Sequence, residues 1–259
     1  MKIIIYSIYL AMAFICVTTP ASAMNIWPTN PYMVLKKNEK SKHDRQDTAL
    51  LFLDNGKKDN VRYQVRIFRW KQNNNQDIYS QQDEIQPQPP IIDFSNDNKQ
   101  VVRLMRLSQS KISSQEEAYR IIIDEIPKSA IKHTGIQFRM RLVIPFFVYS
   151  SQASDDYIPG ISGIPKKIPS TSWKIIKEGE RYMLEIKNTG SVHLRLSDVF
   201  FSHKGSITHA YVLSRGLVGY VLPGQSMRFK LKNWSLGEGN SLNLYSSYGE
   251  GDNRLLKNE

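Results

Sequence analysis

Residues 136–148 have the sequence IQFRMRLVIPFFV, in which every second residue is large and apolar. Side chains of a β-strand point alternately to the two faces of a sheet, so this pattern predicts a strand with one wholly apolar face. At about 3.3 Å per residue the stretch would span about 40 Å, well beyond the usual strand of about five or six residues. The other face begins polar and turns apolar from Val143 onward, so a strand with one buried face explains only the first half.

Two interpretations of this stretch remain open. One is a long strand that crosses a β-sandwich and leads into a linker. The other is a strand at the edge of a sheet, which presents its apolar row to another protein and completes that protein's sheet. A bare edge of this kind would aggregate unless it is protected, which suits a protein that offers the edge to a partner.

The same alternation recurs along the chain at spacings typical of a β-sandwich. Turn sequences such as Asn55-Gly56 and Leu222-Pro223-Gly224 separate the alternating segments. Beyond the N-terminal segment, no stretch of about ten residues keeps a helical period with caps at both ends. The sequence therefore predicts an all-β fold, with strands over residues 62–67, 119–124, 182–187, 192–197 and 227–232.

The N-terminal segment predicts export. Lys2 precedes an apolar run over residues 3–17, and Pro20 and the small residues Ala21-Ser22-Ala23 follow it. This order is typical of a secretory signal peptide, so we expect cleavage after Ala23. A retained membrane anchor is the alternative, but the apolar run is shorter than the ~20 residues that span a bilayer. We therefore expect no membrane insertion of the mature chain.

The length and composition set the domain organisation. With 259 residues, 41% of them apolar, the chain can form one large domain or two of ordinary size. Residues 151–171 contain several Pro, Gly and Ser residues and have the composition of a linker. We expect a signal peptide over residues 1–23, an N-terminal domain over 24–150, a linker over 151–171 and a second β-sandwich domain over 172–259.

Charge and cysteine content exclude several classes of function. The chain has 35 Lys and Arg against 24 Asp and Glu, but export removes nucleic acid as an ordinary partner for this positive charge. The only cysteine, Cys16, lies in the N-terminal segment, so the mature chain has neither a disulfide nor a thiolate zinc site. The five histidines lack the spacing of metal ligands, and no nucleotide-binding or nucleophile motif occurs. We expect no enzymatic activity, no catalytic residue, no metal and no cofactor.

The residues before the long strand resemble those of a known family. Residues 119–127, YRIIIDEIP, followed after a short loop by residues 136–148, resemble the signature of periplasmic pilus chaperones of the chaperone–usher pathway. Residues 69–72 and 144–148 are most similar to the archaic branch of that family. Further segments are similar to the family in the expected order, namely residues 61–70, 100–104, 182–199 and 222–224.

The resemblance implies two immunoglobulin-like β-sandwich domains in an L-shaped arrangement. It also implies a periplasmic chaperone that binds pilus subunits lacking their last strand and delivers them to an outer-membrane usher. The chaperone lends a strand of its own to the subunit, which is donor-strand complementation. Whether the free protein self-associates to protect its edge is left open. In this sequence the donor row consists of Ile136, Phe138, Met140, Leu142 and Ile144.

Better-known members of the family hold the C-terminal carboxylate of the subunit with two basic residues, an arginine in the first strand and a lysine near the end of the lent strand. The present sequence departs from this pattern, because residues 30–35 contain no basic residue and Pro145 stands at the second position. A buried carboxylate still needs charged donors. The candidates are Arg103 and Arg106, with Arg141 and Arg139 behind them.

Two other functions compete with the chaperone. A structural or adhesive subunit of a surface fibre would need an N-terminal donor extension, whereas residues 24–31 are short and interrupted by proline. An exported enzyme with a carbohydrate-binding sandwich would need exposed aromatic residues on one face, and the four tryptophans are dispersed along the sequence. The sequence favours the chaperone.

Overall fold

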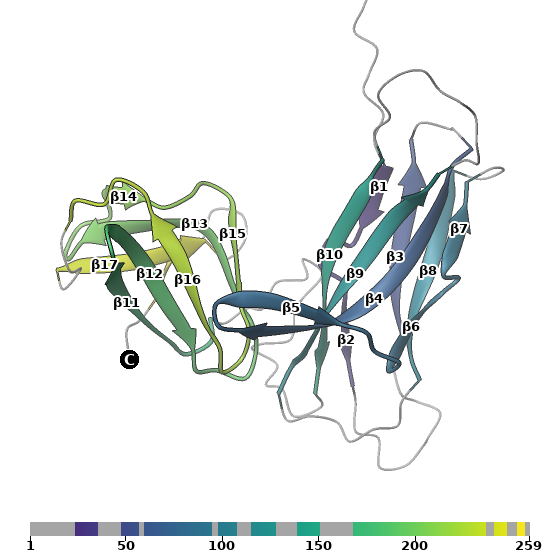
Figure 1. Cartoon of the computed structure of the whole chain (residues 1–259), viewed down its shortest axis with the longest axis horizontal. Coiled ribbons are helices and arrows are strands. Elements are labelled where there is room, and N and C mark those ends of the chain that lie inside the picture. Colours follow the sequence, from purple (N-terminus) through teal and green to yellow (C-terminus); the bar gives the residue numbers. More distant parts are fainter. Residues whose placement is uncertain are drawn as a thin grey trace, which may run out of the picture.

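The computed structural model describes residues 24–35, 48–56, 60–94, 98–107, 115–127, 139–150, 168–236, 241–247 and 253–256. Every regular element in these ranges is a β-strand, and the strands form two sandwiches (Figure 1), which confirms the predicted all-β class. No helix in these ranges is long and apolar enough to cross a membrane. The predicted signal peptide and most of the predicted linker lie outside the described residues.

The first sandwich contains two sheets, which we call the β3 sheet and the β10 sheet. The β3 sheet consists, in spatial order, of β1 (Met24–Trp27), β3 (Thr48–Asn55), β8 (Lys99–Arg106) and β6 (Ile85–Gln88). The β10 sheet consists of β2 (Tyr32–Val34), β10 (Arg141–Tyr149), β9 (Glu117–Ile126), β4 (Arg62–Asn73) and β5 (Gln76–Ser80), with β7 (Ile91–Asp93) beside β4.

The core between these sheets follows from the alternation in the sequence. Burial alternates residue by residue along β3 and along β4 as far as Ile67, as expected for strands with one face inward. Further along β4 the other face is buried, with Trp70 at the contact between the domains. Leu51, Val102, Ile121 and Phe146 are completely buried between the two sheets. The strands predicted over residues 62–67 and 119–124 are confirmed as parts of β4 and β9.

The second sandwich packs a sheet of β11 (Thr171–Glu178), β12 (Arg181–Asn188) and β16 (Ser226–Leu231) against a second sheet. That sheet consists of β14 (His209–Val212), β13 (Leu194–His203), β17 (Leu242–Ser247) and β18 (Asn253–Leu256), with β15 (Leu217–Val221) beside β13. The strands predicted over residues 182–187 and 227–232 are confirmed within one residue. The strand predicted over residues 192–197 begins two residues later, because Val192 and His193 lie at the contact between the domains.

The two sandwiches are inclined to each other, with a concave side between them (Figure 1). The hairpin of β4 and β5 extends from the first sandwich toward the second. A separate apolar cluster fills the contact, with Trp70, Phe147 and Tyr149 from the first domain against Tyr220 and Leu222 from the second. This arrangement agrees with the expected L shape.

Candidate functional site

The β10 sheet has an incomplete edge. β9 pairs with β10 over Arg141–Val148, whereas β2, on the other side, pairs with β10 only over Phe147–Tyr149. Among the described residues, no strand covers residues 141–146 on the β2 side. We call this stretch of β10 the open edge. Main-chain groups on that side can pair with an added strand.

Apolar side chains beside the open edge are only partly buried. Met140 directly precedes β10 and Leu142 lies in it, while Met24 and Ile26 lie on β1, at the edge of the β3 sheet. All four side chains pack against the core of the first sandwich and remain partly exposed. A strand added to the open edge would therefore remove more apolar surface from water.

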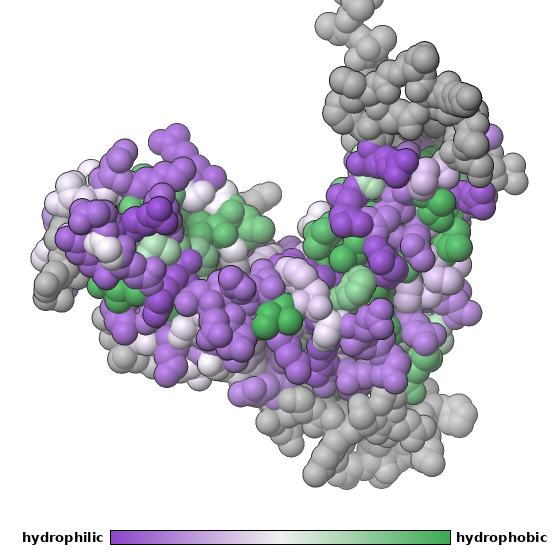
Figure 2. Space-filling model, viewed as in Figure 1, coloured by the Kyte–Doolittle hydropathy of each residue, from purple (hydrophilic) through white to green (hydrophobic). Residues whose placement is uncertain are grey.

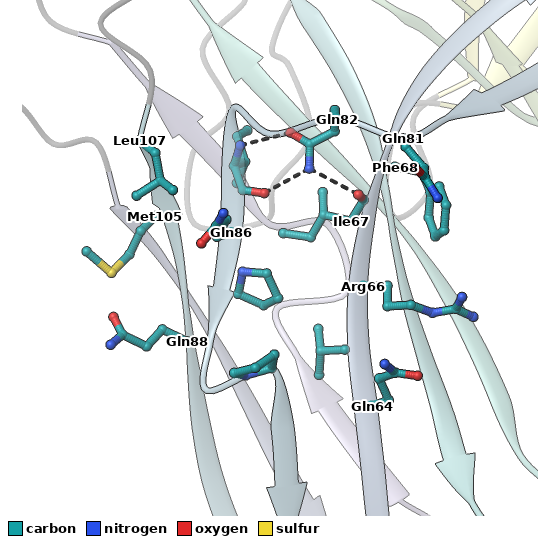
Figure 3. Close-up of a pocket in the computed structure, with 14 residues that line it drawn as sticks. Gln64, Arg66, Ile67, Phe68, Gln81, Gln82, Gln86, Gln88, Met105 and Leu107 are labelled. Carbon is teal, nitrogen blue, oxygen red and sulfur yellow. Dashed lines mark hydrogen bonds between the residues drawn. The ribbon is translucent and has the colours of Figure 1, made fainter.

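The opposite edge of the same sheet is closed by a side chain. β7 pairs with β4 over Arg62–Gln64 and β5 pairs with it over Arg69–Asn73, which leaves a gap between them. In this gap the amide of Gln82 donates from Nε2 to the carbonyl oxygens of Ile67 at 3.0 Å and Ile85 at 2.8 Å, and Oε1 accepts from the Ile85 N–H at 2.8 Å (Figure 3). A groove of about 740 Å³ lies beside it. The two edges of the sheet thus differ. At the β4 edge the Gln82 side chain takes the place of a strand, whereas no described residue does so at the open edge.

The predicted donor row is described from Met140 onward. Leu142 and Met140 face the core and keep exposed surface, whereas Ile144 is only 8% exposed and belongs to the core of its own domain. In this structure Ile144 packs within the core between the two sheets of its own domain, and a role toward a partner stays a prediction. Ile136 and Phe138 lie outside the described residues.

The other face of β10 looks onto the concave side. Val143 is 50% exposed there, and its direct cross-strand neighbour is Ile122. Figure 2 shows hydrophobic surface on the first domain along the concave side, where β10 runs in Figure 1. A partner on the open edge would therefore also meet apolar surface at the concave side.

Asp124 joins three strands of the β10 sheet. Its carboxylate accepts hydrogen bonds from Arg66 on β4 and from Arg141 on β10. Partial burial acts to raise the pKa of Asp124, but the two guanidinium groups outweigh it and hold the pKa below its ordinary value. Arg141, one of the predicted anchoring residues, thus already has an acidic partner.

We expect D124N to lower the free energy of unfolding at pH 7 by about 0.5–1 kcal/mol, a modest effect because the pair is partly screened by solvent. A lowered carboxyl pKa stabilises the fold above the ordinary carboxyl pKa, and this contribution is lost as the pH falls through the lowered value. The difference between wild type and D124N should therefore shrink between about pH 4 and pH 2. Urea unfolding of both proteins at pH 7 and at pH 2.5 measures it, and an equal difference at both pH values would contradict the assignment.

A buried polar pair crosses the contact between the domains. The His193 ring stacks on Phe147 with centroids 3.6 Å apart and an angle of 8°. His193 Nδ1 lies 2.8 Å from Glu116 Oε2, and the His193 N–H donates to Glu116 Oε1 at 3.2 Å. Both side chains are buried. The last residues of β10 are therefore held by the second domain.

Gln72 makes a second polar connection between the domains. Its Nε2 donates to the Tyr220 carbonyl at 2.9 Å, and its Oε1 accepts from the Leu222 N–H at 2.8 Å. The amide thus pairs with the second domain's main chain as a neighbouring strand would. Asp77 Oδ1 accepts hydrogen bonds from both Gln72 Nε2 and Trp70 Nε1 at 2.9 Å, which ties these side chains to the hairpin of β4 and β5.

Arg120 lies at the inner corner between the domains. It is the direct cross-strand neighbour of Pro145, near the end of the open edge. Its guanidinium carbon lies 3.6 Å from the ring centroid of Trp70 and 5.4 Å from that of Tyr220. Its Nε is buried with no hydrogen-bond partner, while another part of the side chain hydrogen-bonds the Tyr79 hydroxyl on β5. The charges of Arg120 and of Arg195 from the second domain both lower the pKa of the Tyr220 hydroxyl, so two positive groups lie near this hydroxyl.

The four predicted anchoring residues lie elsewhere. Arg106 is buried and pairs with Glu117 at 2.8 Å; burial acts to raise the pKa of Glu117, but Arg106 outweighs it and lowers the pKa. Arg103 is exposed on the far face of the β3 sheet, and Arg139 is exposed ahead of β10, at the end remote from the domain contact. These placements do not favour a carboxylate site at any of the four. In the described part of the chain, no three His, Cys, Asp or Glu side chains are grouped to hold a metal ion.

The far face of the β3 sheet carries an exposed apolar patch. Trp27, Leu50, Phe52 and Val101 are between 38% and 60% exposed. Trp27 and Phe52 are cross-strand neighbours with ring centroids 5.5 Å apart, and Val101 is the next neighbour of Phe52. We call these four residues the outer patch. Exposed apolar surface of this kind is typical of a protein–protein contact.

Comparison with known proteins identifies the first domain. Residues 41–152 match the family described as pili and flagellar-assembly chaperone, PapD N-terminal domain. No curated protein sequence matches the chain.

Solved structures share the fold over both domains. A chain of the CsuC–CsuE chaperone and tip adhesion subunit pre-assembly complex, from archaic chaperone–usher Csu pili of Acinetobacter baumannii, is 24% identical, with a TM-score of 0.63 over 90% of this chain and 97% of that one. The E. coli chaperone DraB is 15% identical, with a TM-score of 0.56 over 92% and 97%. The CupB2 chaperone of Pseudomonas aeruginosa is 17% identical, with a TM-score of 0.52 over 88% and 97%. Residues 41–152 therefore match the model of the pili and flagellar-assembly chaperones, and the whole chain has the two-domain immunoglobulin-like fold of solved pilus chaperones.

Proposed function

We propose that this protein is a periplasmic chaperone that binds pilus subunits by donor-strand complementation and delivers them to an outer-membrane usher. The family of the first domain supports the general role. The observation that carries the binding mode is the open edge of β10, which lies beside partly buried core side chains. A subunit that lacks one strand of its own sandwich can pair with this edge and share the core behind it.

The energetics favour such an exchange. Full burial of an apolar side chain contributes about 1.5–3 kcal/mol. Met140 and Leu142 have surface left to bury, and Ile136 and Phe138 extend the same row in the sequence. Main-chain hydrogen bonds along the open edge add affinity that does not depend on the subunit's sequence. Together these contributions can offset the cost of keeping a subunit in an incomplete fold.

We further propose Arg120 as the residue that binds the subunit's C-terminal carboxylate, in place of the four arginines expected from the sequence. Arg120 lies opposite Pro145, where β2 begins to cover the edge and an added strand must end. A strand that ends there and pairs along residues 141–146 runs parallel to β10, as β2 does. A carboxylate could accept charge-assisted hydrogen bonds from this partly buried guanidinium, whose Nε has no partner.

Co-expression with candidate pilus subunits from the same genome tests the function. We expect the subunit to accumulate as a soluble one-to-one complex with the chaperone and to be degraded when expressed alone. A subunit that folds equally well alone would favour the alternative, in which this protein is itself part of a surface fibre.

The outer patch is our candidate contact for the usher, because it lies on the β3 sheet, whereas the open edge that we propose for the subunit belongs to the β10 sheet. We expect W27S/F52S to reduce surface pili more than about tenfold while the soluble yield of the chaperone–subunit complex stays within about twofold of wild type. Pilus counts by electron microscopy and pull-down of the subunit measure the two effects. I78S, a change of an exposed residue on β5, is the control. Unchanged pilus numbers in W27S/F52S would rule out this face.

A further inference from the structure

We propose that Trp70 and Tyr220 form an aromatic clamp that positions Arg120, so that the carboxylate site is complete only while the two domains are docked. This inference rests on the proposed function, in which Arg120 binds the subunit's carboxylate. It adds two positioning residues, one from each domain, and it makes the contact between the domains part of the binding site.

The contacts of Arg120 support the clamp. The guanidinium carbon lies 3.6 Å from the Trp70 ring centroid, which is stacking distance, and 5.4 Å from that of Tyr220. The two rings stand nearly perpendicular, at 85°, with centroids 5.5 Å apart. A guanidinium stacked on a ring keeps its N–H groups in its own plane, where an anion can accept from them. Stacking thus fixes the plane of the Arg120 guanidinium without using N–H donors, and the hydrogen bond to the Tyr79 hydroxyl leaves other donors of the same group for a carboxylate.

The clamp depends on the docked domains because its rings come from different sandwiches. Trp70 lies on β4, and Gln72, two residues further on the same strand, holds the main chain at Tyr220 and Leu222. Asp77 on β5 accepts from both Trp70 and Gln72. The hydrogen bonds that join the domains therefore also fix the two rings that contact Arg120.

Charge at the clamp favours an anionic ligand. Burial raises the pKa of the Tyr220 hydroxyl, and Arg195 and Arg120 oppose this rise through their positive charge. Two guanidinium groups, one from each domain, thus act on the same hydroxyl. A carboxylate bound between them reduces their mutual repulsion, and by linkage it also strengthens the docking of the domains.

The alternative is that Trp70 only fills the apolar contact between the domains. Trp70 is 2% exposed and lies 5.9 Å from Phe147, so it has that packing role in either case. A purely structural role predicts that a Trp70 variant binds every ligand more weakly to the same degree. A positioning role predicts a selective loss of preference for a free carboxylate.

The test compares two peptides that copy the C-terminal strand of the pilus subunit, one ending in a carboxylate and one in an amide. We expect the full-length wild type to bind the carboxylate form about 10- to 100-fold more tightly. R120A should abolish this preference. W70L and Y220L should each reduce it to less than about threefold and change the affinity for the amide peptide little. In the R120A background W70L should have no further effect on the ratio.

The controls separate the possible failures. W234L removes a buried tryptophan from the core of the second domain, away from Arg120, and should keep the preference. If W70L does not fold, Y220L removes the other half of the clamp and gives the same comparison. A preference lost in R120A but kept in W70L or Y220L would overturn the clamp and leave the proposed function standing. A preference that survives in R120A, or the absence of any peptide binding, would instead contradict the proposed function on which the clamp rests.

Discussion

Replacement of Met140 and Leu142 by aspartate is expected to abolish recovery of the pilus subunit from cells that express both proteins. Both side chains lie beside the open edge with surface still to bury, and each contributes about 1.5–3 kcal/mol when a partner covers it. An aspartate in the same place must lose its water without gaining a charged partner. The expected loss of affinity exceeds about 100-fold, measured as soluble subunit yield and by titration with purified subunit.

The controls for this variant separate binding from folding. L217D places the same charge on an exposed apolar site in the second domain and should leave subunit yield unchanged. M140D/L142D should still fold, because both side chains are only partly buried in the free chaperone. Normal subunit yield with a folded M140D/L142D chaperone would mean that the donor row does not enter the subunit. A second variant, I136D/F138D, extends the comparison to the first half of the row.

The second large effect is expected at Arg120. R120A should weaken binding of a subunit with its natural C-terminus by about 10- to 100-fold, because a charge-assisted hydrogen bond in a partly buried site is lost. The same variant should bind a subunit carrying two extra C-terminal residues no more weakly than wild type does, since in that subunit the carboxylate no longer reaches the corner. Isothermal titration with both subunits measures the difference.

Arg103 provides the matched control, because it is an exposed arginine on the far face of the first domain. R103A should leave both affinities unchanged. A larger loss of subunit affinity in R103A than in R120A would mean that the carboxylate is bound by a residue expected from the sequence and not by Arg120. If R141A lowers the stability of the chaperone but not its affinity for the subunit, the result agrees with the pairing of Arg141 with Asp124.

Sequence patterns predicted the strands well because alternation is a local property. Every second residue over 62–67, 119–124 and 182–187 was predicted to face inward, and these residues are buried or partly buried in β4, β9 and β12. The same patterns could not show that the apolar residues of the predicted strand over residues 136–148 differ in their exposure. Leu142 keeps exposed surface and Ile144 does not, since the position of the β3 sheet decides between them.

The candidate site was harder to predict because it depends on which strands are neighbours. Arg120 stands in the stretch that carries the family resemblance, but its alternation places it only on the face away from the core. Its position opposite Pro145 and against Trp70 follows from strand pairing and from the docking of a second domain. Arg106 was chosen for its charge, and only the fold shows that Glu117 already neutralises it.

Hydrogen exchange along β10 tests the central claim most directly. The main-chain N–H groups of Arg141 and Val143 point away from β9, because Phe147 of the same alternation donates to Pro31 on the β2 side, and Pro145 has no N–H. These two amides should exchange fast in the free chaperone and slow by more than about 100-fold in the subunit complex. Amides of the same strand that pair with β9 are protected in both states and serve as the internal reference. Protection of the open edge on subunit binding is the result that strand addition predicts. Unchanged exchange over residues 141–146, with new protection elsewhere on the chaperone, would contradict it.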